Sequence, residues 1–441
     1  MMALGTLPAQ LGAAAFDVTA YGAKGDGKTL DTVAIQKAID AAAQAGNGVV
    51  VFKPGEYLSG SLFLKSNMEM RVDEGVVIRG VQDLAAYPVM QTRIAGVEMR
   101  WPSALINIYE QSHVKLDGKG TIDGDGKIWW DKYWTVRRAE YEPRGLRWAS
   151  DYDCQRPRLI QVYKSTDVEL KDLNLHRSGF WTVHLCYSQR IVADGLTIRN
   201  NIGGKGPSTD GIDVDSSSDV LVTHCDIECN DDAICLKAGR DADGLRVNRP
   251  TEKVRIIDNT VRGGAAGVTS GSETSGGIRD VVVKGLNVLG TVSNGILFKS
   301  TSTRGGTIEN FDISDVTTTG IPTPVSVTLN WNPSYSNTKL PENGLPAGLK
   351  EIPDYWKVLT EAVPPEKGMP HLRHIRVSNM KSTGAQKAFQ VTSYADSPLV
   401  DFEFRNIEIE AKTAGTITNS RGWKMENVRI KTADGSTLEV K

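Results

Sequence analysis

The sequence lacks several features that would assign it at once to a common class of protein. Its five cysteines are odd in number and none forms a Cys-x-x-Cys pair, so we expect buried free thiols rather than a disulfide framework. No apolar run approaches the roughly 20 residues of a membrane-spanning helix. The net charge of −2 gives no overall positive field to gather nucleic acid. These absences favour a chain with neither a membrane span nor a nucleic-acid partner.

Helical patterning is also scarce. One segment, 32–43, is the one clear helix, with Asp31 as a candidate N-cap and an apolar stripe formed by Ile35, Ala38, Ile39 and Ala42. The chain is instead rich in glycine, with 44 residues, and its apolar content of 40% is sufficient for a large core. A length of 441 residues favours two domains or one long repetitive architecture.

Repetition is what the chain does have. Blocks of alternating apolar residues broken by Asp, Asn or Gly lie at 113–124, 167–176, 190–201, 219–230, 253–262, 280–290 and 307–316, with weaker copies at 374–382, 401–410 and 423–430. From residue 167 onward the block starts are spaced by 23, 29, 34, 27 and 27 residues. This spacing is too long for hairpins and too poor in helix for βαβ units.

A coil of stacked strands fits this spacing, because each turn of a solenoid pairs only with its neighbours and extra residues leave it as loops. We predict a single right-handed parallel β-helix over residues 16–441, with the helix at 32–43 capping its N-terminal end. Residues 1–15 are expected to be an N-terminal extension or the remnant of a signal peptide. A β-sandwich or barrel is the structural alternative.

Three aspartates stand at strand ends in consecutive repeats: Asp210, Asp231 and Asp232. Asp210 and Asp231 are 21 residues apart, close to one short coil, so we expect them on adjacent turns about 5 Å apart. Neighbours on a regular strand face opposite ways, so Asp231 and Asp232 share a cleft only if the chain bends there.

Such a cluster suits acid–base chemistry, because mutual repulsion raises the pKa of one carboxyl and leaves an acid beside a base. Glycoside hydrolysis with inversion requires one protonated acid and a carboxylate that activates water. The alternatives are ordinary turn aspartates or a calcium site.

The runs around these aspartates resemble glycoside hydrolase family 28, the polygalacturonases and rhamnogalacturonan hydrolases. The resemblance lies in STDGIDVD at 208–215, NDDAICLKAGRD at 230–241 and GSE at 271–273, with a similar N-terminal opening at 16–32. It extends from about residue 16 to residue 330. By this resemblance Asp231 is the general acid, and Asp210 and Asp232 position and deprotonate the attacking water. No metal or cofactor is implied.

The departures from the family pattern bear on the substrate. Polygalacturonases have Asn at Ser208, a His within the block 265–267, and Arg at Leu297, two residues before the retained Lys299. That Arg and Lys grip a sugar carboxylate, and Leu297 in place of the Arg offers an apolar surface instead. A methyl-bearing rhamnose suits such a surface, so the leading substrate is the galacturonate–rhamnose linkage of rhamnogalacturonan.

Further substrate contacts are expected from basic and polar residues near the aspartates. Lys237 and Arg240 are the candidates for gripping galacturonate, although Lys237 is alternatively a solvated charge or a partner of Asp241. Lys299 keeps the family's Lys position. His184 is a candidate for binding sugar or, equally, a structural histidine.

A segment rich in aromatic residues and arginine between 129 and 158 is a second candidate for binding, because aromatic rings stack on sugars and Arg binds carboxylates. The alternative is a loop packed over the coil. If this loop closes one end of the cleft, the enzyme acts on chain ends, and endo or exo action stays open.

The sequence therefore predicts an inverting glycoside hydrolase of pectic polysaccharide, monomeric and secreted or periplasmic. A polygalacturonase on homogalacturonan is the alternative within the family. A pectate lyase and a non-catalytic pectin-binding β-helix are the alternatives of other classes.

Overall fold

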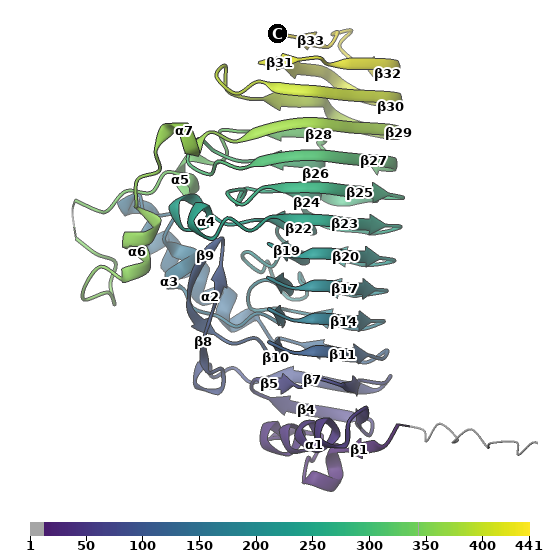
Figure 1. The fold of residues 1–441 in the computed structure, drawn as a ribbon, viewed down its shortest axis with the longest axis vertical. Helices are drawn as coiled ribbons and strands as arrows, with labels where there is room; N and C mark the ends of the chain where they lie inside the picture. Colours follow the sequence, from purple (N-terminus) through teal and green to yellow (C-terminus); the bar gives the residue numbers. More distant parts are fainter. Residues whose placement is uncertain (1–12, 343) are drawn as a thin grey trace, which may run out of the picture.

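A computed structural model describes residues 13–342 and 344–441, and these residues form one stack of parallel β-strand coils (Figure 1). The predicted right-handed parallel β-helix is confirmed: 31 strands belong to one continuous sheet. An antiparallel hairpin of β8 (Val89–Ile94) and β9 (Val97–Pro102) lies outside the stack. Of the extension predicted for residues 1–15, residues 1–12 lie outside the described part of the chain.

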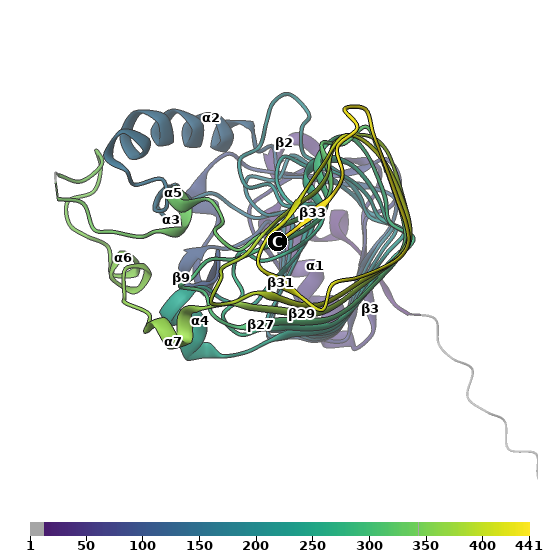
Figure 2. The ribbon, with the colours of Figure 1, turned by 90° about the horizontal axis from the view of Figure 1, so that it is seen from above.

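The strands form three parallel ladders, which are the faces of the stack seen from its end in Figure 2. Ladder A contains β1 (Ala15–Asp17), β3 (Gly48–Val51), β6 (Met68–Arg71), β11 (Ser112–Asp117), β14 (Thr166–Lys171), β17 (Gln189–Asp194), β20 (Ser218–Thr223), β23 (Thr251–Ile257) and β25 (Ile278–Lys284). Ladder B contains β2 (Asp26–Leu30), β4 (Gly55–Ser59), β7 (Val76–Gly80), β12 (Thr121–Asp123), β15 (Asn174–His176), β18 (Thr197–Arg199) and β21 (Asp226–Glu228). Ladder C contains β5 (Leu62–Leu64), β10 (Ile106–Tyr109), β13 (Ile160–Tyr163), β16 (Val183–Cys186), β19 (Ile212–Asp215), β22 (Ile234–Lys237) and β28 (Thr323–Thr328).

In the C-terminal coils the ladders are joined by longer, continuous strands: β24 (Thr260–Ser270), β26 (Asn287–Lys299), β27 (Thr307–Thr319), β29 (His371–Thr392) and β30 (Leu399–Ile417). The last strands are β31 (Ser420–Arg421), β32 (Lys424–Thr432) and β33 (Glu439–Val440). All ten blocks of the sequence repeat fall on strands.

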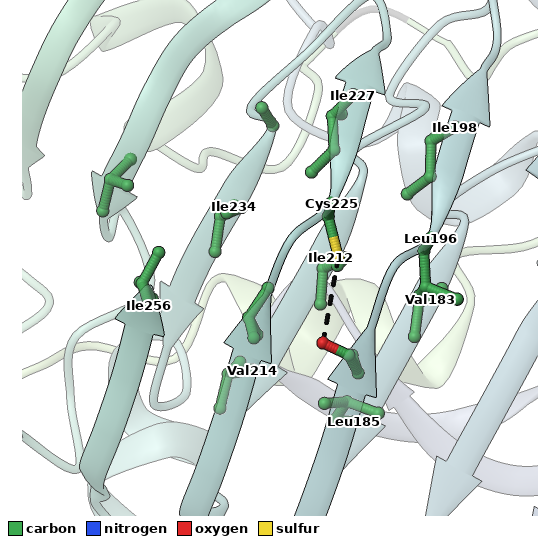
Figure 3. Packing of buried hydrophobic residues seen from close by; sticks show 14 of the residues in the cluster. Val183, Leu185, Leu196, Ile198, Ile212, Val214, Cys225, Ile227, Ile234 and Ile256 are labelled. Carbon is green, nitrogen blue, oxygen red and sulfur yellow. Dashed lines mark hydrogen bonds between the residues drawn. The ribbon is translucent and has the colours of Figure 1, made fainter. Parts of the chain in front are cut away.

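The core lies inside the coils because the side chains of each strand alternate between the interior and the outside. In β19, Ile212 and Val214 belong to the buried apolar core, whereas Asp213 and Asp215 face outward. The parallel register stacks Val183 on Ile212, and Leu185 on Val214, so that rows of apolar residues run along the stack (Figure 3). The outward row of the same strands is thereby available for polar chemistry.

The predicted N-terminal cap is confirmed as α1 (Thr32–Ala45), and its apolar stripe is fully buried. Asp31 occupies the N-cap position of this helix as predicted, but its side chain makes no capping hydrogen bond. Its backbone is already helical, with φ −90° and ψ 0°, and its carboxylate instead accepts hydrogen bonds from the backbone of Lys24 at 2.8 Å and Gly25 at 3.0 Å.

The expectation of one clear helix is wrong. Further helices lie on one side of the stack (Figures 1 and 2): α2 (Lys127–Val136), α3 (Ser150–Asp153), α4 (Asp241–Val247), α5 (Pro333–Ser336), α6 (Asp354–Leu359) and α7 (Pro365–Gly368). All are in segments that enter or leave ladder C. Trp101, Trp148 and Trp356 from three of these segments share a second buried cluster. Within the described residues, no helix is both long and apolar enough to cross a membrane.

Replacing Leu185 by Ala should destabilise the protein by about 2–5 kcal/mol, because the side chain is fully buried between coils and its loss leaves a cavity. The exposed Val282 on β25 is the matched control, and Val282→Ala should cost less than about 1 kcal/mol. Urea denaturation followed by circular dichroism measures both, and equal shifts would contradict this account of the core.

Candidate active site

The three predicted aspartates lie where the chain enters ladder C. Asp210 and Asp232 immediately precede β19 and β22 and occupy matching positions, since Ile212 pairs with Ile234 and the Gly211 N–H donates to the Asp232 carbonyl at 2.9 Å. Asp210 and Asp231 lie on adjacent turns, as the sequence spacing predicted, but the residue that matches Asp210 in register is Asp232. The chain bends at Asp231. Such a bend is required if Asp231 and Asp232 are to share one cleft.

One cavity is lined by all three aspartates. Its other acidic residues are Asp151 and Glu273, and its basic residues are Arg147, Lys237 and Lys299. Aromatic and small polar side chains complete the wall: Phe180, Trp181, Trp331, Tyr335, Ser208, Ser272 and Asn332, together with Ala95. The cavity is therefore polar and strongly charged, with rings that can stack on a sugar.

Asp232 is the carboxylate that stays ionised. Lys299 Nζ lies 2.7 Å from its Oδ2, and Thr269 Oγ1 donates to its Oδ1 at 2.9 Å. Burial alone would raise the pKa of Asp232, but Lys299 and Lys237 lower it below the usual range.

Asp231 has the opposite tendency. Burial and the adjacent charge of Asp232 raise the pKa of Asp231. Its Oδ1 accepts a hydrogen bond from the Asp232 N–H at 3.0 Å. Two sequence neighbours thus have pKa values displaced in opposite directions, which is the arrangement of an acid beside a base.

Asp210 is coupled to a carboxyl that sequence reasoning did not single out. Asp213, fully buried on the outward side of β19, accepts no hydrogen bond of ordinary geometry from any described residue. Burial and the charge of Asp213 raise the pKa of Asp210, and burial raises the pKa of Asp213 to about 7. The strand alternation within the run STDGIDVD was the signal that could have located Asp213 beside Asp210.

Lys237 holds this acidic cluster together. Its Nζ lies 3.4 Å from Asp210, 3.4 Å from Asp213 and 3.5 Å from Glu273, and 5.0 Å from the centre of the Trp181 ring. Burial opposes the charge of Lys237, but the surrounding acidic groups raise its pKa well above the usual value. Lys237 lines the cavity as predicted, yet its charge is engaged by the protein's own carboxylates.

Arg240, by contrast, lies behind the cavity. It is fully buried, and it donates to Asp241 Oδ2 at 3.2 Å, to the Tyr152 hydroxyl at 3.1 Å and to the Tyr335 carbonyl at 2.8 Å. The prediction that Arg240 grips galacturonate is therefore corrected. Its guanidinium instead positions Tyr335, which does line the cavity.

His184 and Leu297 are likewise buried and do not belong to the described cavity lining. His184 contacts Arg158 Nη1 at 2.8 Å and Asp215 Oδ2 at 3.3 Å, which makes it a structural histidine; burial lowers its pKa to about 4. Leu297 pairs in register with Thr269 and is 2% exposed. Neither side chain is placed to contact sugar directly.

Several cavity residues were not assigned from the sequence. Glu273 was quoted only as part of a motif, and Trp331 and Tyr335 lie beyond the last family run, in a segment with no repeat signal. Asp151 and Arg147 belong to the aromatic and arginine-rich segment. Because both residues line the cavity, part of this segment does more than pack over the coil.

The carboxylates leave room for a water molecule. Ligand atoms of Asp210, Asp232 and Cys235 lie within 4.8 Å of one another, a separation that one water can bridge with two hydrogen bonds of about 2.8 Å. A cation would compete there with Lys299, which already contacts Asp232 at 2.7 Å.

The chain is similar to known proteins in both sequence and structure. The family model described as glycosyl hydrolases family 28 matches residues 44–348. A probable polygalacturonase of Vitis vinifera is 29% identical over 67% of this chain, which spans only 59% of that relative's length. An exo-poly-alpha-D-galacturonosidase of Dickeya chrysanthemi is 25% identical, covering 96% of this chain and 74% of its own. A hyperthermoactive exopolygalacturonase from Thermotoga maritima has a crystal structure that matches with a TM-score of 0.75 at 25% identity, over 96% of this chain and 93% of that one. The chain therefore belongs to glycosyl hydrolase family 28.

Proposed function

We propose that this protein hydrolyses α-galacturonosyl linkages of galacturonan with inversion at the anomeric carbon. The observation that carries the proposal is the pair of adjacent carboxyls with opposed pKa shifts, Asp231 raised and Asp232 lowered, in one charged cavity. Asp231 donates a proton to the leaving oxygen. Asp232, with Asp210, orients and deprotonates the attacking water on the other side of the bond.

The substrate preference changes from the one that the sequence favoured. Rhamnogalacturonan was favoured because Leu297 would meet a methyl group, but Leu297 is 2% exposed and outside the described cavity lining. The cavity is instead strongly charged, with three basic side chains among eight charged ones, and so suits a charged sugar better than a methyl-bearing one. Several relatives that bear the name polygalacturonase support galacturonan as well.

Attack at a chain end is the finer part of the proposal. The segments 81–105 and 124–159, together with described residues of 329–342 and 344–370, supply most of the second buried cluster and also contribute side chains to the cavity lining. Walls of this kind favour a pocket that receives one end of a polymer over an open groove. Relatives of both kinds exist: the Dickeya chrysanthemi protein is named as an exo enzyme and a Pectobacterium carotovorum relative as an endo enzyme.

The lyase alternative requires a cationic residue that can give up its proton to act as a base. The carboxylates around Lys237 and Lys299 raise the pKa of both lysines although burial opposes this. Both therefore stay protonated, which favours hydrolysis over elimination.

Digestion of polygalacturonate should release reducing ends without the ultraviolet absorbance of unsaturated products, and should do so equally with a chelator. Galacturonate monomer should be the first product, and NMR of that product should show the inverted anomer. Rhamnogalacturonan should be cleaved more slowly. Unsaturated products would establish a lyase, a retained anomer would contradict the proposed water attack, and absence of cleavage would favour a binding protein.

Asp231→Asn should lower kcat by about 10² to 10⁴-fold or more, because the leaving oxygen then departs without a proton and acid and water activation act as a unit. Asp40→Asn, on the exposed side of α1, is the matched control and should leave kcat unchanged. Reducing-end assays measure both, and near-normal turnover of Asp231→Asn would remove it from the acid role.

The rate should fall on both sides of a pH optimum. It falls as pH rises through the raised pKa of Asp231, because the acid loses its proton, and as pH falls through the pKa of Asp232, because the base gains one. Lys299→Met removes the cation that lowers the pKa of Asp232, so the acidic limb of kcat/KM should move to higher pH. The exposed Lys284→Met is the control, and an acidic limb that stays in place in Lys299→Met would contradict the assignment.

A further inference from the structure

The positive charges in the cavity are already paired with carboxylates of the protein. Its two lysines are engaged by the protein itself, since Lys237 is surrounded by Asp210, Asp213 and Glu273, and Lys299 contacts Asp232 at 2.7 Å. Leu297 stands where family 28 polygalacturonases have an arginine. A galacturonate that enters the cavity brings a further negative charge, and these positions offer no free guanidinium to receive it.

Arg147 supplies a guanidinium from a different part of the chain. It lies in the segment 124–159, between β12 and β13, and lines the cavity with 17% of its side chain exposed. Its Nη1 donates to Asp151 Oδ2 at 2.8 Å and to Ser150 Oγ at 3.2 Å. The ring of Tyr335 lies 5.3 Å from its Cζ. No described residue accepts a hydrogen bond from Nε or Nη2, which together form the edge that binds a carboxylate side-on.

Arg147 shares its carboxylate partner with a second arginine. Asp151 is shared between two guanidiniums, because Arg156 Nη2 also lies 3.1 Å from its Oδ1. Arg156 is held between the rings of Tyr133 and Phe180, at 4.4 and 4.3 Å. Two cations thus share one anion. Among the described residues Arg156 Nε finds no acceptor either, but Arg156 is buried between the two rings, and of these two arginines only Arg147 lines the cavity.

Ser208 joins this cluster to the catalytic residues. Its Oγ donates to Asp151 Oδ1 at 2.9 Å, and Asp210 follows it by two residues. Two departures from the polygalacturonase pattern thus concern the same cluster. Ser208, in place of Asn, anchors Asp151, and Asp151 orients Arg147, which takes the place of the arginine missing at Leu297.

We propose that Arg147 binds the carboxylate of the galacturonate in the cavity through its Nε and Nη2 and so determines specificity for the acid over neutral sugars. The proposal rests on the proposed action on galacturonan. Arg147 is a substrate-binding residue in it and takes no part in proton transfer.

The test compares trigalacturonate with its fully methyl-esterified form. Arg147→Gln should raise KM for trigalacturonate by about 100-fold, because two charge-assisted hydrogen bonds are lost, and should change kcat by less than about 3-fold. On the ester, kcat/KM should stay within about 2-fold of wild type, so the preference for the acid collapses. Arg147→Lys keeps the positive charge but not the paired donors of the guanidinium, so its KM for trigalacturonate should be about 10-fold higher than that of wild type.

Arg144→Gln is the matched control, because Arg144 lies on the same segment, pairs with Glu140 at 3.2 Å and does not belong to the described cavity lining. It should behave as wild type. Circular dichroism checks the fold of each variant, and if Arg147→Gln fails to fold, Arg147→Lys decides. Full preference for the acid in a folded Arg147 variant would overturn the proposal.

A binding experiment distinguishes failure of this inference from failure of the proposed function. Calorimetry with trigalacturonate is carried out on Asp231→Asn with and without Arg147→Gln. Hydrolysis by wild type with binding that does not depend on Arg147 overturns the inference alone. Binding that depends on Arg147 in a wild-type protein that hydrolyses nothing supports the inference and overturns the proposed function. Absence of both binding and hydrolysis overturns both.

Discussion

The in-register pairing of parallel strands in ladder C is the constraint on which both the core and the site depend. Pairing of Ile212 with Ile234 stacks apolar side chains inside the coil and, in the same step, sets Asp210 beside Asp232 outside it. A slip of one residue would turn the apolar row outward and separate the two carboxylates. The pairing that stabilises the core therefore also fixes the relative positions of Asp210 and Asp232.

This geometry forces carboxylates together, and their repulsion has to be offset where water is excluded. Lys237 and Lys299 provide the compensation, each within 3.5 Å of at least one carboxylate. Five carboxyls, Asp210, Asp213, Asp231, Asp232 and Glu273, surround two ammonium groups, so charge balance leaves protons in the cluster. The lysines thus lower the pKa of Asp232 below its usual value while that of Asp231 stays above it, which is the basis of the proposed base and acid roles. The charges of both lysines therefore act on the protein's own carboxylates even when no substrate is bound.

The sequence predicted the features that repeat and failed on those that do not. Strand alternation located all ten blocks, and the two aspartate runs located the site. The spacing of 21 residues correctly placed Asp210 and Asp231 on adjacent turns, but it could not show that Asp232 matches Asp210, because the register is set by hydrogen bonding between β19 and β22. Arg240 was assigned to substrate binding from its proximity to the aspartates, and Leu297 from the family's Arg position, but both side chains are buried. The role of Tyr335 was invisible, since only the fold brings residue 335 to residue 210.

The insertions explain how a uniform coil acquires a particular substrate. A coil position such as Leu297 is restricted by its partners Thr269 and Ser326 in the ladder, and a change there disturbs packing in both directions along the stack. An insertion such as 124–159 packs on the outside, through its own aromatic cluster, and can bring a side chain over the site without altering the register. A carboxylate-binding group can therefore move from the coil to an insertion while the catalytic aspartates stay in place. If Arg147 binds the substrate carboxylate and the aspartates carry out hydrolysis, as proposed, then specificity and catalysis are carried by parts of the fold under different constraints.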